Sequence, residues 1–141
     1  MFINEPQTIK TMIKLLLNIL LLANLTTQTG KSDAEFSIVF EKVDNQVEIY
    51  AGKELLYTSG LIGNNPELNL SYTFKLSDIK GSEITIKLKN GVTEDGNESD
   101  RHWEIMYELF KNNEPVDYQW ESADDYKTGI VFEKTYDLST L

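Results

Sequence analysis

Apolar and polar residues alternate along most of the chain after residue 35. In residues 36–41, Phe36, Ile38 and Phe40 take every second position, and a second alternating run follows at residues 47–51. Alternation with a period of two is typical of a β-strand that has one buried and one solvated face. We therefore expect two strands here, joined as a hairpin through the polar segment 43–46. The first of them could also be an edge strand or a strand swapped between two chains.

The same alternation recurs in six further segments. Short stretches rich in Gly, Asn, Pro and Asp separate these segments, and such residues favour turns. The pattern predicts strands at residues 55–58, 69–76, 83–89, 103–110, 116–121 and 127–138.

Strands with one solvated face usually pair antiparallel, and two such sheets bury their apolar rows by stacking face to face. The pattern therefore predicts an all-β fold, an antiparallel β-sandwich of seven or eight strands, with a closed barrel as the alternative. The chain has 141 residues, enough for one domain. We expect that domain to span residues 31–141.

The N-terminal part has a different pattern. Eight of the eleven residues 15–25 are leucine or isoleucine, Lys10 and Lys14 precede them, and a polar stretch follows at 26–30. A basic flank, a short apolar core and a polar exit are typical of a secretory signal peptide, and the run is shorter than the roughly 20 residues of a membrane span. We expect a signal peptide at 1–30, with cleavage as late as residue 34 and Met12 as an alternative start. The alternative is a buried or amphipathic helix.

Composition narrows the partners and the chemistry. The chain carries 13 Lys and Arg against 23 Asp and Glu, a net charge of −10, which argues against nucleic acid and anionic membranes as partners. It has no cysteine and one histidine, which excludes disulfides, thiol catalysis and metal sites built from several imidazoles. An exported domain without cysteine favours a bacterial source, and a secreted, periplasmic or cell-surface location. We expect no membrane insertion after signal cleavage.

Two segments carry a resemblance to a known class of domain. Residues 47–55 (VEIYAGKEL) and 77–90 (SDIKGSEITIKLKN) each place a Gly and a Lys in a turn next to alternating strands. This order resembles the jelly-roll or immunoglobulin-like β-sandwich modules, carbohydrate-binding or accessory, of secreted bacterial proteins. The resemblance implies a binding or accessory role and transfers no individual binding residue.

An acidic loop at residues 93–100 is a candidate calcium site. Asp95, Asn97 and Ser99 lie at alternate positions and Asp100 follows, so the loop offers the hard oxygen ligands that calcium prefers. It lacks the Gly and Glu that an EF-hand requires at its sixth and twelfth positions. The alternative is a solvated acidic loop, and the protein then needs no cofactor.

A second candidate site surrounds the last predicted turn. Trp120 and Tyr126 flank Asp124 and Asp125. Exposed aromatic rings stack on the C–H faces of sugars, and carboxylates accept hydrogen bonds from sugar hydroxyls. These four residues form our predicted ligand-binding rim. Trp120 is also in phase with Val116 and Tyr118, which fits a core position, and the pattern predicts the core for Tyr72, Trp103, Tyr107, Tyr118 and Tyr136.

Catalysis has little support in the sequence. There is no Gly-x-Ser-x-Gly motif, and His102 is the one histidine that could act as a base. His102 could instead be a ligand, a pH-sensitive contact or an ordinary strand-edge residue. We predict an exported, non-catalytic module that binds a glycan or a protein. The alternatives are a secreted inhibitor or assembly protein, and then a small hydrolase.

Overall fold

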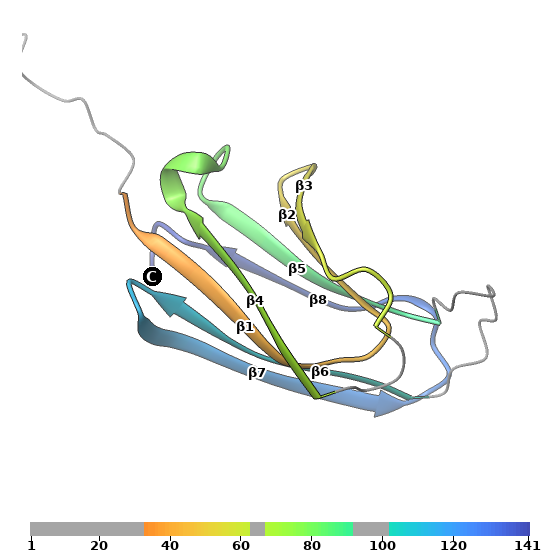
Figure 1. Cartoon of the computed structure of the whole chain (residues 1–141). Coiled ribbons are helices and arrows are strands. Elements are labelled where there is room, and N and C mark those ends of the chain that lie inside the picture. Colours follow the sequence, from red (N-terminus) through yellow and green to blue (C-terminus); the bar gives the residue numbers. More distant parts are fainter. Residues whose placement is uncertain (1–32, 63–66, 92–101) are drawn as a thin grey trace, which may run out of the picture. The chain divides into compact units, whose positions relative to one another are not determined.

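The structure is a computed structural model, and it describes residues 33–62, 67–91 and 102–141. These residues form eight strands and one short 3-10 turn, η1 (Figure 1). The elements are β1 (Glu35–Val43), β2 (Gln46–Ala51), β3 (Glu54–Thr58), β4 (Glu67–Lys75), η1 (Leu76–Asp78), β5 (Glu83–Asn90), β6 (His102–Lys111), β7 (Glu114–Asp124) and β8 (Gly129–Asp137).

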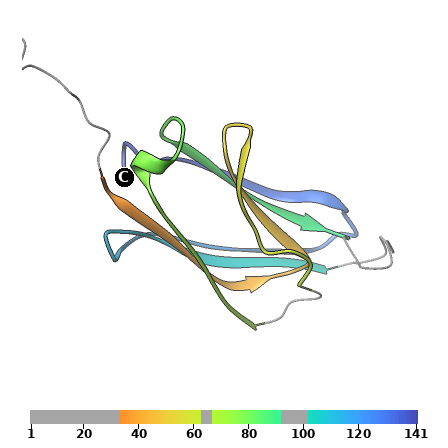
Figure 2. The same cartoon turned by 45° about the horizontal axis from the view of Figure 1, so that its top comes forward.

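The strands form two four-stranded sheets, which Figures 1 and 2 show as two stacked layers. Sheet A has the order β4-β1-β6-β7, and sheet B has the order β3-β2-β5-β8. Every pair of neighbouring strands is antiparallel. The predicted antiparallel β-sandwich is therefore confirmed. The two sheets are separate, so the described chain is not a closed barrel.

The core lies between the two layers. Sheet A contributes the row of β1 that the alternation predicted, Phe36, Ile38 and Phe40, and all three are fully buried. The Phe40 ring lies 5.7 Å from the ring of Tyr107 in β6 and 6.3 Å from the ring of Tyr57 in β3, centroid to centroid. Burying such large side chains supplies the main favourable term in folding. The fully buried apolar residues of sheet B are Val47, Ile49, Ile84, Ile86 and Leu88.

The expected hairpin between the first two strands is wrong. β1 lies in sheet A and β2 in sheet B, so the chain crosses between the layers at Asp44 and Asn45. The Asp44 amide donates to the Glu104 carbonyl of β6 (2.9 Å), and the Asn45 side-chain amide donates to Asn90 of β5 (2.7 Å). This short link is thus held by both sheets. β1 lies between β4 and β6, so it is not an edge strand either.

A turn follows the sixth strand, as expected, but it is short, because β7 begins at Glu114 and not at residue 116. Asn112 and Asn113 both have positive φ angles (51° and 67°) and join β6 to β7 as a hairpin. Two successive positive φ angles are typical of the tight turns that match strand twist, and Asn tolerates them. The register of β7 against β6 then shifts between Phe110 and Leu109, which leaves Val116 without a partner, and this shift decides which of the later residues face the solvent.

The unit Ser32–Leu141 is compact. Within the described residues, no helix has the length and apolar character needed to cross a membrane. The signal peptide predicted for residues 1–30 lies outside the described residues and stays a prediction.

Candidate functional site

In β7, unlike in the other strands, the apolar row faces the solvent and the polar row faces the opposite sheet. Register pairs Tyr118 with Glu108 and Trp120 with Met106, on the outer face of sheet A. The aromatic side chains are therefore exposed, with 50% of Tyr118 and 61% of Trp120 accessible to solvent. Residues in register share a face, because side chains alternate across a sheet. The prediction of a core position for Tyr118 is wrong. We call Tyr118 and Trp120 the aromatic row.

The register shift at Val116 turns this row outward, and polar contacts inside the sandwich stabilise the arrangement. Asp117 lies on the inner face of β7 and accepts hydrogen bonds from Tyr136 (2.7 Å) and Lys134 (2.9 Å) of β8 in the other sheet. The hydroxyls of Tyr107 and Tyr136 are 2.9 Å apart. Because the Tyr136 proton is donated to Asp117, Tyr107 is the donor between them. Gln119, next on the inner face of β7, also donates to Asp117 (2.9 Å).

These contacts change the protonation of the cluster. Although partial burial opposes ionisation, the hydrogen bonds from Tyr136 and Lys134 hold the pKa of Asp117 below its ordinary value. Burial, together with bonds to Tyr107 and Asp117, raises the pKa of Tyr136. The polar groups on the inner face of β7 thus have hydrogen-bond and ion-pair partners inside the sandwich, while the apolar row of β7 faces the solvent.

A buried carboxylate orients the indole of Trp120. Glu104 is on the outer face of β6, yet only 5% of it is exposed. It accepts a hydrogen bond from Trp120 Nε1 (2.8 Å), and Lys42 Nζ of β1 lies 3.2 Å and 3.3 Å from its two oxygens. A charged acceptor makes stronger hydrogen bonds than a neutral one. Trp120 is therefore held at one end while most of its surface stays accessible.

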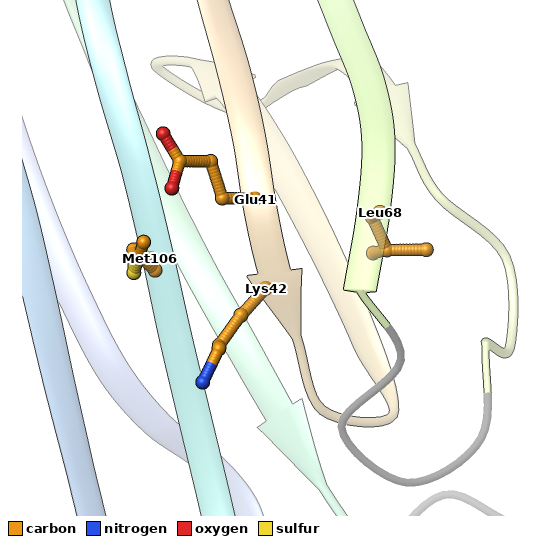
Figure 3. A pocket seen from close by; sticks show the side chains of 4 residues that line it. All are labelled: Glu41, Lys42, Leu68 and Met106. Atoms are coloured by element: carbon orange, nitrogen blue, oxygen red, sulfur yellow. The ribbon is translucent and has the colours of Figure 1, made fainter.

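A bulge in β1 hollows the same face. The register of β1 shifts between Phe40 and Lys42 against both neighbouring strands. The extra residue puts Glu41 and Lys42 side by side over the outer face, and Figure 3 shows both extending from β1 toward β6. With Met106 and Leu68 they line a hollow of about 280 Å³, the β1 hollow. Bulges often redirect side chains at functional sites.

The β1 hollow and the aromatic row belong to one surface. Lys42 is in register with Met106, and Met106 is in register with Trp120, so the three lie in one line across β1, β6 and β7. Two strand spacings separate Lys42 from Trp120, about 10 Å between backbones. An extended ligand that crosses the strands can therefore contact both.

The predicted rim is only partly on this surface. Trp120 lies in the aromatic row, and Asp124 at the end of β7 is 2.8 Å from Nδ1 of His102. Asp125, in the turn after β7, accepts hydrogen bonds from the Trp103 indole (3.1 Å) and from Lys127, and the bonds from Lys127 lower its pKa. Tyr126 follows with 65% exposure. The ligand-binding role of these four residues stays a prediction.

The other core predictions hold for three aromatic residues. Trp103, Tyr107 and Tyr136 are buried, as their phase indicated. Tyr72 is only partly buried, with its ring 5.1 Å from that of Tyr57.

The calcium prediction falls outside the described residues. Asp95, Asn97, Ser99 and Asp100 all lie in the segment 92–101. In the part of the chain that is described, no group of three or more His, Asp or Glu side chains is placed to hold a metal ion.

Replacing Glu104 by glutamine tests how the indole is held. The substitution keeps an acceptor and removes the charge that pairs with Lys42, so we expect a loss of about 1–2 kcal/mol in the free energy of unfolding. Urea denaturation measures this loss, and iodide quenching of tryptophan fluorescence reports a more mobile Trp120. Glu108→Gln on the same face is the matched control, because Glu108 forms no ion pair with a described residue. Equal losses in both variants would contradict the anchoring role.

The sequence of β7 shows the alternation of apolar and polar residues but does not show which of the two rows faces the solvent. Val116, Tyr118 and Trp120 alternate with Asp117, Gln119 and Glu121, so either row could face inward. The β1 hollow gave no signal, because a bulge depends on pairing with two other strands.

Comparisons with known proteins assign the chain to no family. No protein-family model, no curated protein and no solved structure matches the chain. The fold and its surface define the class: an antiparallel β-sandwich with an exposed aromatic row on one sheet.

Proposed function

We propose that this protein is an exported, non-catalytic module that binds a glycan on the outer face of sheet A. The observation that carries the proposal is the exposed aromatic row of β7, with Trp120 anchored to a buried carboxylate. A large aromatic face that is accessible and already oriented loses little entropy on binding. Sugar rings present C–H groups that complement such a face.

Two further features support a sugar as the ligand. Tyr118 and Trp120 lie on the same face two residues apart, a spacing of about 7 Å along the strand. The β1 hollow adds the carboxylate of Glu41 and the ammonium group of Lys42, which can accept from and donate to hydroxyls. A shallow surface that combines apolar and polar groups in this way suits a saccharide chain.

Titration with oligosaccharides tests the proposal. The panel consists of hexamers of glucose, xylose, mannose, N-acetylglucosamine and glucosamine, added to the purified protein while tryptophan fluorescence is followed. Because Trp103 is buried and Trp120 is exposed, stacking on Trp120 is expected to shift the emission to shorter wavelength. Isothermal calorimetry gives the dissociation constant.

A panel in which no saccharide binds would overturn the glycan proposal. The exposed row and the edge of β7 would then favour a protein partner, since an exposed apolar surface at a sheet edge also serves protein binding.

A calcium melt tests the acidic loop. If Asp95, Asn97, Ser99 and Asp100 bind calcium, the ion stabilises the folded protein by about 2.7 kcal/mol at a hundred times its dissociation constant. The melting temperature in excess calcium is then expected to exceed that in EDTA by several degrees. Magnesium at equal concentration is the control for ionic strength. Identical melts in calcium and EDTA would show the loop to be a solvated acidic segment.

A further inference from the structure

The surface that holds the aromatic row and the β1 hollow has an excess of negative charge. Among the described residues around it, Lys42 is the one ammonium group, and it is paired with the buried carboxylate of Glu104. Glu41 and Glu108 are further carboxylates that form no ion pair with a described residue. The surface is therefore complementary to a ligand that carries positive charge.

Glu41 is the carboxylate best placed to meet such a ligand. It is exposed, forms no ion pair with a described residue, and stands at the wall of the β1 hollow (Figure 3). The bulge directs it over the face, beside the apolar side chains of Leu68 and Met106. A group that combines a cation with an apolar ring face would satisfy the carboxylate and cover those side chains together.

Trp120 favours the same charge. A cation over an indole face is attracted by the ring quadrupole, most strongly for tryptophan. Trp120 and the hollow lie along one line of register across three strands, about 10 Å from end to end. A short chain of amine-bearing rings can contact both at once.

We infer that the ligand is an oligomer of amino sugars with free, protonated amines, bound across β1, β6 and β7. The inference rests on the proposed function and specifies its ligand class. One ring stacks on Trp120, while another ring enters the β1 hollow and its ammonium group pairs with Glu41. The overall charge of −10 also attracts such a cation at long range.

The test compares three hexamers that differ at one position of the ring. Hexaglucosamine carries the amine, chito-hexaose carries its neutral acetamide, and cello-hexaose carries a hydroxyl. At a mildly acidic pH and low ionic strength, we expect hexaglucosamine to bind at least about tenfold more tightly than either neutral hexamer. This advantage is expected to shrink as salt is added, because exposed charges are screened.

Two variants locate the contact. Glu41→Gln is expected to weaken hexaglucosamine binding by up to about fivefold, the range for one exposed ion pair, with no effect on the neutral hexamers. Glu133→Gln, on the outer face of sheet B, is the matched control and is expected to leave binding unchanged. Glu41 is exposed, so its substitution leaves the fold intact, and a thermal melt verifies this.

The outcomes separate this inference from the proposed function. If neutral hexamers bind through Trp120 as tightly as hexaglucosamine, the amino-sugar inference fails and glycan binding stands. If Glu41→Gln and Trp120→Ala both bind hexaglucosamine as tightly as the wild type does, the attraction is non-specific and the inference fails. If no saccharide binds, both fail. Binding of hexalysine alone, with the same dependence on Glu41 and Trp120, would overturn both in favour of a basic peptide.

Discussion

Replacing Trp120 by alanine is expected to weaken oligosaccharide binding by about 10- to 100-fold and to leave the fold intact. The indole is 61% exposed, so its loss removes little core packing. A central, oriented aromatic side chain commonly contributes about 2 kcal/mol or more to binding, and each 1.4 kcal/mol is a factor of ten. Calorimetry with the tightest-binding hexamer of the panel measures the loss, and the melting temperature is expected to change by only a few degrees.

Two companion variants sharpen this result. Trp120→Phe keeps a ring but removes the hydrogen bond from Nε1 to Glu104, so binding is expected to fall between those of the wild type and the alanine variant. Tyr126→Ala removes an equally exposed aromatic residue from the turn after β7. An equal loss in Tyr126→Ala would support the rim predicted from the sequence. Undiminished affinity in Trp120→Ala would rule out the aromatic row as the binding surface.

Replacing Asp117 by alanine is expected to destabilise the protein by about 2–3 kcal/mol and to lower the melting temperature by roughly 10 °C. Asp117 joins the two sheets by accepting hydrogen bonds from Tyr136 and Lys134. Its removal leaves the Tyr136 hydroxyl without its acceptor and the Lys134 ammonium group without its counter-ion. Urea denaturation measures the change. Glu133→Ala, which removes the surface pair with Lys87, is the control and is expected to cost about 0.5 kcal/mol or less.

The hydrogen bonds of Asp117 also predict that the free energy of unfolding falls at acid pH. Because the pKa of Asp117 is lower in the folded than in the unfolded protein, its contribution is complete above the unfolded value of about 3.9 and is lost as pH falls through the folded value. Asp117→Asn lacks this titration. The difference in unfolding free energy between wild type and Asp117→Asn is therefore expected to shrink below about pH 4. A constant difference down to low pH would show that Asp117 gains nothing from its charge.

Local alternation was sufficient to find the strands because the two faces of a strand differ in composition. The buried row of β1, with Phe36, Ile38 and Phe40, is evident from the sequence, and so is the turn at Asn112 and Asn113. Which strands share a sheet was not evident from the sequence. The link at Asp44 and Asn45 resembles a hairpin turn locally, and only its bonds to β6 and β5 show that it crosses the layers.

The candidate site shows the same division. Trp120 was proposed from its type and its place at a predicted strand end, and the sequence grouped it with Tyr126. Its place on one face with Tyr118 came only from the register. The orientation of β7 depends on the register shift at Val116 and on Asp117, whose acceptor role requires Tyr136 and Lys134 from the opposite sheet. An alternating strand is symmetric with respect to which face is buried until a partner is known.

The sequence by itself determined the all-β class, the strands and turns, and the acidic balance, because these follow from local periodicity, turn chemistry and composition. The tertiary structure decided which strands share a sheet, that the aromatic row of β7 faces the solvent, and that Glu41, Lys42 and Trp120 lie on one surface. These features depend on register and on contacts between residues far apart in the chain. A local pattern does not contain that information.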